Sequence, residues 1–308
     1  MRNIYLGSIS ESNAFLGFNK QLEETPFIVV GAPLDMSTSY RGGCSRAPKA
    51  LREASKSLEL CTAFSNIDLE QVGFHDLGDI VLAPGDILQS LARIENVIYE
   101  ILGYNKIVFI LGGEHTITLP AFKAFSKRFQ NPCLIVFDAH ADLRHEYLGS
   151  RYNHATVIKR ISEETQYKKI VVVGARAISR EEIEQVKSMY GRISVIRVVG
   201  SAQNDFVERL EREVKVCENS PKYLSIDIDF IDPSYAPGVQ TPEPLGSTPT
   251  DLLNAISRIV DEKLLAIDIV EITPKYDPSE ITAFLGAKIV VEIAGIIARR
   301  LKVGNGCW

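Results

Sequence analysis

Residues 134–142 read Leu-Ile-Val-Phe-Asp-Ala-His-Ala-Asp, an apolar run that ends in carboxyl and imidazole side chains. The apolar part is nearly continuous and rich in branched residues, as in strands that are buried on both faces. The same pattern recurs along the chain, so that the predicted strands are Phe27–Gly31, Ile107–Gly112, Leu134–Asp138, Ile170–Gly174, Ile193–Val199, Tyr223–Asp227 and Leu264–Val270.

Segments with helical spacing lie between these runs, at Ile87–Leu102, Pro120–Phe129, Arg180–Tyr190, Asp205–Val216, Pro249–Glu262 and Glu280–Leu301. One helix start is well marked, because Thr248 can cap it, Pro249 suits the first helical position and Asp251 the third. Ser45–Ala50 has a similar pattern. Strands and helices alternate throughout, which predicts a three-layer α/β/α fold with a mostly parallel central sheet. No linker is evident, so we expect a single catalytic domain over residues 1–308.

The composition excludes several classes of protein. Of 308 residues, 45% are hydrophobic and 24% charged, which is typical of a globular protein with a large core. The net charge of −5 comes without runs of like charge, so neither a nucleic-acid footprint nor a membrane-surface patch is predicted. No apolar stretch approaches the roughly 20 residues that span a bilayer. Residues 1–5 lead into polar sequence rather than a signal peptide.

The cysteines predict the cellular compartment. The five, at positions 44, 61, 133, 217 and 307, are odd in number, scattered and without a Cys-x-x-Cys pair. This pattern favours neither a disulfide framework nor a zinc ribbon. We therefore expect reduced thiols and a cytoplasmic protein.

Three predicted strand ends carry the residues that can do chemistry, since ligands of such folds bind beyond the carboxyl ends of the strands. The three stretches are 111–118, 137–142 and 225–233. Asp138 and His140 are two residues apart, as are Asp227 and Asp229, so each pair can point to one side of an extended chain. A single such pair is more typical of a turn or cap than of a ligand site. Three clusters at buried strand ends are not explained in that way.

Converging carboxylates indicate bound cations. Buried like charges repel each other and cannot all stay ionised without a positive partner, and each unpaired ion would cost several kcal/mol. Four carboxylates with two imidazoles exceed what one ion needs and suit two ions that share bridging carboxylates. Oxygen-rich ligands with some imidazole favour Mn²⁺ over zinc or copper, while iron, nickel and cobalt remain open.

The clusters resemble the three signature motifs of the ureohydrolase (arginase/agmatinase) family. These are Gly112-Gly113-Glu114-His115, the stretch Asp138–Asp142, and Ser225–Asp229 followed by Asp232-Pro233. Gly31–Asp35, Asp76–Asp79 and Glu271 are further matches, and the order along residues 26–300 is the family's. The resemblance implies an arginase-like fold and two manganese ions per chain.

The resemblance also implies a role for each residue. One metal ion would be held by His115, Asp138, Asp142 and Asp227, and the other by Asp138, His140, Asp227 and Asp229. Glu271 would pair with the substrate guanidinium, for which a carboxylate is the bidentate partner. Asp142 would hydrogen-bond a water shared by the metals, and His154 would return a proton to the departing amine. The catalytic residues would thus be His154, Glu271 and Asp142, with Glu271 and His154 binding the substrate. The products would be urea and a primary amine.

The substrate is less sharply indicated. Arginine is disfavoured, because Arg144 and Ser179 stand where arginases read its amino-acid end. The sequences around Glu114 and at Tyr235–Gly238 resemble those of agmatinases, which make putrescine from agmatine. Val239-Gln240 departs from the agmatinase pattern of Thr-Gly. Arg144 facing the pocket would repel agmatine and suit an acidic tail such as that of guanidinobutyrate; we favour an outward Arg144 paired with Glu146.

Several alternatives stay open. Within the family they are a guanidinobutyrase, an arginase or a formiminoglutamase. A dinuclear phosphoesterase is disfavoured because His115 precedes Asp138 in the chain. A metal-stabilised binding protein is disfavoured because it needs neither His154 nor Glu271. The resemblance implies a homo-oligomer, trimeric or hexameric, without nucleic-acid or membrane partners. The tail, residues 303–308, is expected to be mobile or to dock on a neighbour through Trp308.

Overall fold

The computed structural model describes residues 4–7, 13–189, 191–199 and 205–308. Its strands are β1 Phe27–Ala32, β2 His75–Asp79, β3 Ile107–Gly112, β4 Cys133–Phe137, β5 Lys169–Val173, β6 Ile193–Ile196, β7 Lys222–Asp227 and β8 Leu264–Val270. Its α-helices are α1 Ala47–Ser55, α2 Leu69–Val72, α3 Ile87–Ile101, α4 Thr118–Arg128, α5 Val157–Glu164, α6 Arg180–Ser188, α7 Asp205–Val214, α8 Pro249–Ile259 and α9 Ile281–Leu301.

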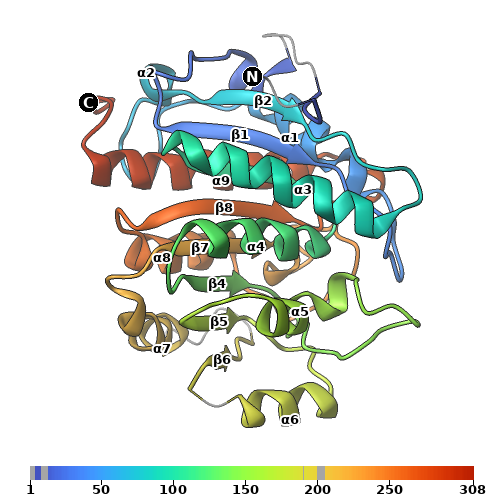
Figure 1. The fold of residues 1–308 in the computed structure, drawn as a ribbon. Helices are drawn as coiled ribbons and strands as arrows, with labels where there is room; N and C mark the ends of the chain where they lie inside the picture. Colours follow the sequence, from blue (N-terminus) through green and yellow to red (C-terminus); the bar gives the residue numbers. More distant parts are fainter. Residues whose placement is uncertain (1–3, 8–12, 190, 200–204) are drawn as a thin grey trace.

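The strands form one eight-stranded sheet in the order β2-β1-β3-β8-β7-β4-β5-β6 (Figure 1). All neighbouring strands are parallel, which confirms the predicted architecture. The last strand of the chain, β8, lies in the middle of the sheet between β3 and β7. The carboxyl ends of β3, β8, β7 and β4 are therefore side by side, although their sequences are far apart.

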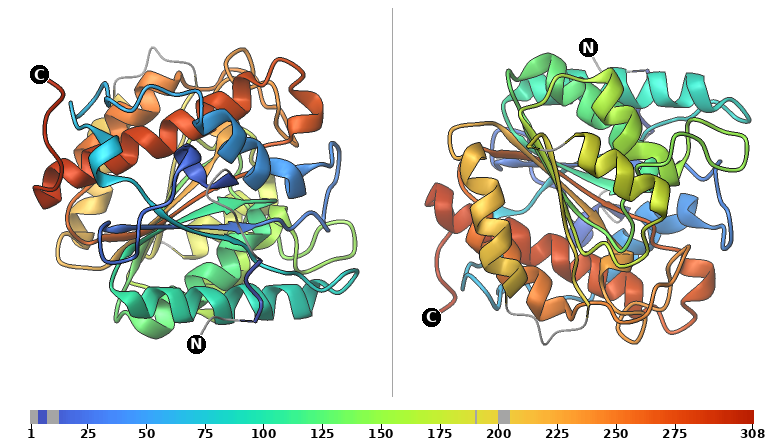
Figure 2. Two further views of the ribbon diagram at one scale, coloured as in Figure 1. Left: turned by 90° about the horizontal axis from the view of Figure 1, so that it is seen from above. Right: turned by 90° about the horizontal axis from the view of Figure 1, so that it is seen from below.

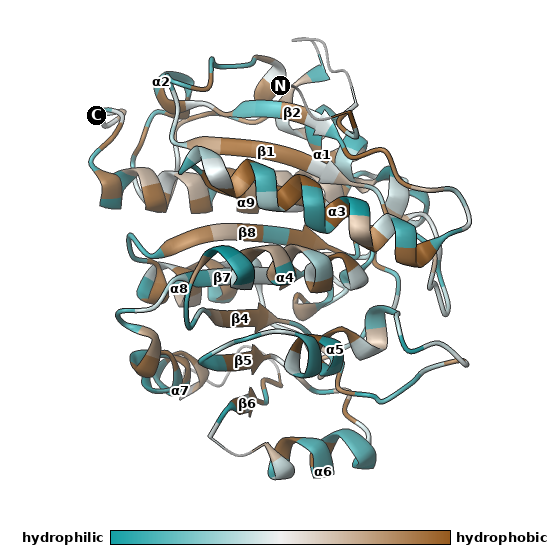
Figure 3. Cartoon of the chain, viewed as in Figure 1, coloured by the Kyte–Doolittle hydropathy of each residue, from teal (hydrophilic) through white to brown (hydrophobic). Residues whose placement is uncertain are grey.

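Helices cover both faces of the sheet (Figure 2). Helices α3, α4 and α5 pack with one apolar cluster, and α1, α7, α8 and α9 pack with the other. The strands between them are apolar along most of their length (Figure 3), as expected when water is excluded from both faces. The apolar runs were thus sufficient to place every strand except β2.

The strand β2 was missed because its sequence is not apolar. It reads His-Asp-Leu-Gly-Asp and alternates between half-buried and buried residues at the edge of the sheet. Helix α5 was also missed. The cap of α8 is as predicted, since the Thr248 hydroxyl accepts a hydrogen bond from the Asp251 amide and the Asp251 carboxylate accepts one from the Thr248 amide. Tyr190, the predicted end of α6, and residues 1–3 lie outside the described residues.

Helix α9 is the longest apolar helix among the described residues. Its 21 residues are long and apolar enough to cross a membrane by length and composition alone, although Lys288 and Glu292 interrupt the apolar run. In this structure 78% of its most apolar stretch is buried, and it packs with α1 against the sheet. The long apolar run is explained by a core helix that is covered on nearly all sides.

The cysteine prediction was wrong. Cys61 pairs with Cys307 and Cys133 with Cys217, which leaves Cys44 as the buried free thiol. The first bridge fixes the C-terminal tail, where the Asp68 amide also donates to the Asn305 carbonyl at 3.0 Å. The tail is therefore anchored within its own chain, although Trp308 is 93% exposed. Scattered spacing concealed both pairs, because pairing depends on distances in the fold.

Candidate metal centre and active site

The candidate site lies beyond four neighbouring strands, β3, β8, β7 and β4. In the sheet register Phe137 pairs with Ile226, and Asp227 pairs with Val270. Asp138, the residue after Phe137, is thus level with Asp227, and Glu271 follows Val270 directly. His115 follows β3. Parallel pairing alone therefore brings residues from four distant stretches to one edge.

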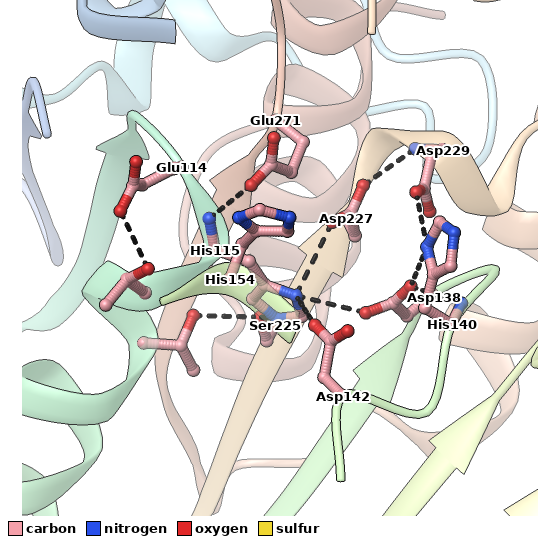
Figure 4. Close-up of polar contacts among 12 residues, drawn as sticks. Glu114, His115, Asp138, His140, Asp142, His154, Ser225, Asp227, Asp229 and Glu271 are labelled. Carbon is pink, nitrogen blue, oxygen red and sulfur yellow. Dashed lines mark hydrogen bonds and ion pairs between the residues drawn. The ribbon is translucent and has the colours of Figure 1, made fainter. Parts of the chain in front are cut away.

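Three carboxylates surround His115 (Figure 4). Its Nδ1 lies 3.0 Å from an oxygen of Asp138, 3.0 Å from one of Asp142 and 3.4 Å from one of Asp227. All four side chains are buried. The backbone of Asp142 is in the left-handed region, with φ 49°, an unusual conformation for a residue with a side chain that is often found at functional sites.

A second group adjoins the first through Asp138. The Nδ1 of His140 lies 2.9 Å from Asp229 Oδ2 and 3.4 Å from Asp138 Oδ1. Backbone amides hold these carboxylates in place: Asp138 accepts from the His140 amide, and Asp229 accepts from the Ala139 amide. Asp138 therefore belongs to both groups, which is the position of a bridging ligand.

The donor atoms of the two groups fit divalent cations. Ligand atoms of His115, Asp138 and Asp142 all lie within 4.8 Å of one another, and so do those of Asp138, His140 and Asp229. His115 Nδ1, Asp138 Oδ2 and Asp229 Oδ2 are buried without a conventional hydrogen bond. Buried polar atoms are rarely left in this state unless an ion or water completes them.

The acidity of the cluster gives the same indication. Burial, with the nearby Asp229 and Asp138 carboxylates, raises the pKa of Asp227 well above its usual range. Burial and Asp138 also raise the pKa of Asp142 to about 7. Such shifts express the cost of placing several negative charges together in a dry site, and a cation removes that cost.

A buried network behind His115 orients its ring. Its Nε2 lies 3.2 Å from Ser225 Oγ, and Ser225 donates to Asp268 at 2.6 Å. Asp268 also accepts from Thr118 and Tyr223. Because the Ser225 hydrogen goes to Asp268, Nε2 must carry a proton, and Nδ1 is the nitrogen that faces the carboxylates and would bind a metal ion. Asp268 was missed in the sequence, though a lone acid within the apolar run Leu264–Val270 was an available signal.

Glu271 lies beside the metal-ligand cluster and is held on both oxygens. Its Oε1 accepts from the His115 amide at 2.6 Å, and its Oε2 accepts from Gln240 Nε2 at 2.8 Å. Burial raises the pKa of Glu271 to about 8. Its φ of 66° is again left-handed. Gln240 is fully buried. Where agmatinases have Thr-Gly, Val239-Gln240 of this chain thus provides a side-chain amide that donates to Glu271, the candidate partner of the guanidinium.

His154 comes from the loop before α5 and is also buried. Its Nδ1 lies 3.2 Å from Ser37 Oγ and its Nε2 lies 3.2 Å from Ser39 Oγ. Burial, followed by the charges on His140 and His115, lowers the pKa of His154 to about 4. Ser37 and Ser39 were missed in the sequence, although they follow β1 in the same way that the ligands follow β4.

A cleft of about 350 Å³ leads to the site. Its lining joins His140, Asp142 and His154 to Ser39, Arg144 and Tyr147. The Arg144 guanidinium stacks on the Tyr147 ring at 5.0 Å, and within the described part of the chain it forms no ion pair. The expected outward pairing of Arg144 with Glu146 is therefore wrong, because Arg144 packs on Tyr147 and faces the cleft.

The remaining candidates have local roles. Ser179 also lines the cleft, but its side chain caps α6 by accepting from the Glu182 amide. Asp232 accepts from the amides of Ser234 and Gly246, as expected for a turn residue. His75 contacts the Lys20 carbonyl at the edge strand, and His145 is exposed. None of these is a ligand in this arrangement.

Comparison with known proteins identifies the family. The sequence profile described as "Arginase family" matches residues 25–295. The chain belongs to the arginase family. An agmatinase of Bacillus anthracis is 33% identical over 281 residues, which cover 91% of this chain and 94% of that protein. The guanidinobutyrase of Pseudomonas aeruginosa is 32% identical over 287 residues, 90% of this chain and 88% of that protein.

A solved structure agrees with the arginase-family fold. The agmatine ureohydrolase of Thermoplasma volcanium is 36% identical to this chain, with a TM-score of 0.81 over 92% of this chain and 93% of that one. Arginase-family enzymes carry a binuclear metal centre and hydrolyse C–N bonds of amidines, and this chain is a hydrolase of that kind. The two groups around Asp138 are the candidate ligands of such a centre.

Proposed function

We propose that the protein is a manganese-dependent amidinohydrolase that cleaves a guanidino compound to urea and a primary amine. The observation that carries this proposal is the pair of ligand groups sharing Asp138, with Glu271 beside them. A guanidinium carbon is a poor electrophile, so its hydrolysis needs an activated water, a partner for the cation and a proton for the leaving amine. The site offers candidates for all three.

The proposed metal ligands are the residues of the two groups, with Asp227 added to both sets. His115, Asp138, Asp142 and Asp227 would hold one ion, and Asp138, His140, Asp227 and Asp229 the other. Carboxylate-rich ligands with one imidazole per ion favour Mn²⁺. When bound, such a pair of cations lowers the pKa of water and so supplies a nucleophile near neutral pH.

The protein's own groups would do the rest. Glu271 would orient the planar guanidinium through its carboxylate, which the His115 amide and Gln240 hold in one orientation. Asp142 would accept a hydrogen bond from the water and help to move its proton. His154 would be a neutral base, because burial lowers its pKa to about 4. It would first take up a proton released by the water and then pass that proton to the departing amine.

Agmatine, giving putrescine, is the proposed substrate, because several relatives along nearly the whole chain are agmatinases. The test is a urea assay of Mn²⁺-loaded protein across agmatine, guanidinobutyrate and arginine, with formamide measured from formiminoglutamate. Turnover of agmatine well above the others supports the proposal. Metal at about two per chain without turnover of any compound would instead favour a binding protein.

Arg144 favours a second substrate class. A cation that faces the cleft without an acidic partner would repel the ammonium of agmatine and attract a carboxylate. A guanidino acid such as guanidinobutyrate is therefore the second candidate. Arg144→Gln should lower kcat/KM for guanidinobutyrate and raise it for agmatine. Arg151→Gln is the matched control and should change neither rate. Arg151 is on the same loop as Arg144, but it pairs with Glu163 of α5 and lies outside the cleft lining.

Two broader features stay proposals. We propose a homo-oligomer of three or six chains, which light scattering would test. We also propose a cytoplasmic location, although the two disulfides weaken the argument from the cysteines, because disulfides are rare in most reducing compartments. Cell fractionation would test it, and recovery outside the cytoplasm would exclude it.

A further inference from the structure

Both ring nitrogens of His154 contact the segment that follows β1. Ser37 Oγ lies 3.2 Å from Nδ1, and Ser39 Oγ lies 3.2 Å from Nε2. A neutral imidazole has one N–H donor and one acceptor nitrogen, and the acceptor is the atom that can take up a proton. The partners of the two serines therefore decide which nitrogen of His154 can act in proton transfer.

The hydroxyl hydrogen of Ser37 has a better acceptor than His154. Ser37 Oγ lies 2.7 Å from Glu114 Oε1, a shorter contact than its 3.2 Å to the imidazole. Glu114 is fully buried and accepts in addition from the amides of Met36 and Ser37 and from the Thr116 hydroxyl. Each Glu114 oxygen thus faces two donors, and the Ser37 hydroxyl hydrogen is assigned to the shorter contact, the one with Glu114 Oε1.

The two lone pairs of Ser37 Oγ must then accept. One accepts from the backbone amide of His154 at 3.1 Å, a group that can only donate. The other faces Nδ1, which can make this contact only if it carries a hydrogen. Ser39 does not compete, because its hydroxyl can donate or accept at Nε2.

We propose that Ser37, backed by Glu114, fixes His154 as the Nδ1–H tautomer and leaves Nε2 as the atom that exchanges protons. Ser39 Oγ lies 3.2 Å from Nε2, and both Ser39 and His154 line the cleft. Ser37 is thus a positioning residue, and Ser39 is a cleft hydroxyl in contact with Nε2. The inference rests on the proposed function only for the catalytic role of His154.

The tautomer can be observed directly, because the chain has only five histidines. The experiment records ¹⁵N ring shifts of histidine-labelled protein loaded with diamagnetic Zn²⁺, with His154→Asn to assign the His154 signals. We expect protonated Nδ1 and unprotonated Nε2 in the wild type. Ser37→Ala should populate the Nε2–H tautomer, Ser37→Thr should restore the wild-type pattern, and Ser39→Ala, the matched control, should keep Nδ1–H.

Turnover gives the second readout. In Mn²⁺-loaded protein, Ser37→Ala should lower kcat by about 10- to 100-fold, within the usual contribution of a positioned acid or base. KM and metal content should stay near wild type, and Ser37→Thr should recover most of the rate. A structural defect would instead change metal content and thermal stability as well.

The outcomes separate this inference from the proposed function. A wild-type His154 protonated on Nε2 overturns the inference, whatever the variants do, and so does Ser37→Ala with an unchanged ring spectrum. The expected tautomer in a protein that turns over no guanidino compound supports the inference and overturns the function. Urea release by a protein whose His154 is protonated on Nε2 supports the proposed function and overturns the inference.

Discussion

Two groups of buried carboxylates in this protein have opposite surroundings. At the edge strand β2, Asp76 accepts from Arg52 at 2.8 and 2.9 Å and from the amides of Phe15 and Gly78. In the middle of the sheet, Asp138 and Asp229 each keep a buried oxygen without a conventional hydrogen bond. The carboxylate at β2 has the Arg52 guanidinium as its counter-charge. Among the described residues, the carboxylates of the central group have only the imidazoles of His115 and His140.

The difference separates a structural acid from a ligand. Although burial works against it, Asp76 and Asp79 raise the pKa of the Arg52 guanidinium, so this ion pair stays charged inside the protein. In the central group burial instead raises the pKa of Asp227 and Asp142. A fold that tolerates such a cluster is expected to complete it with cations from solution.

The largest effect is expected from Asp138→Asn. A ligand shared by both groups is lost, so metal binding should weaken and activity should fall together, by at least about a thousandfold if several kcal/mol of metal catalysis is removed. Metal analysis and urea release on one sample measure both. A variant that keeps two ions and its rate would show that Asp138 is not shared.

The converse substitution is Asp76→Asn. It leaves Arg52 buried without a full counter-charge, which is expected to cost about 3–5 kcal/mol of the free energy of unfolding. Chemical denaturation measures this loss, while metal content and KM of the folded fraction should match wild type. Reduced metal binding with unchanged stability would contradict the division into two kinds of acid.

Glu271→Gln should affect substrate and not metal. Losing a charge-assisted partner for the guanidinium costs about 1.5–3 kcal/mol, or roughly 10- to 150-fold in kcat/KM. Steady-state kinetics beside metal analysis measures it. Wild-type kinetics would show that Glu271 does not meet the guanidinium.

Ser225→Ala should have a smaller effect on metal affinity. The ring of His115 would lose its link to Asp268, and outer partners of this kind are worth about 10- to 100-fold in metal affinity. Competition with a chelator measures the change. The control is Ser126→Ala, whose hydroxyl bonds only the Lys123 carbonyl within α4 and should bind metal as wild type does.

The smallest expected effect is on pH dependence after metal removal. Without metal, burial raises the pKa of Glu271 to about 8 and of Asp142 to about 7. The folded state then holds protons that the unfolded chain has released, so this stability is full below the unfolded values near 4 and is lost as pH rises toward 8. Melting temperatures in chelator should fall over that window. Mn²⁺-loaded protein should not show this fall, and parallel curves would contradict the prediction.

The sequence predicted most of the sheet and the convergence of the candidate metal ligands for one physical reason. Strands that are buried on both faces can be recognised in a sequence as apolar runs. The polar residues directly after them lie at the carboxyl-terminal edge of the sheet. Asp138, His140 and Asp227 were found in this way. The edge strand β2 was not, because Asp76 and Asp79 are polar residues whose partner Arg52 lies on another element.

What the sequence did not reveal depends on contacts between distant segments. Gln240 meets Glu271, and Ser37 meets His154 across 117 positions. The pairing of Cys61 with Cys307 spans 246 positions. Spacing along the chain carries no information on such pairs.

Anomalous diffraction from crystals soaked in Mn²⁺ tests the central claim most directly. The account predicts two peaks per chain, one among His115, Asp138, Asp142 and Asp227 and one among Asp138, His140, Asp227 and Asp229. A single peak, peaks elsewhere, or no peak with the carboxylates turned away from each other would contradict it.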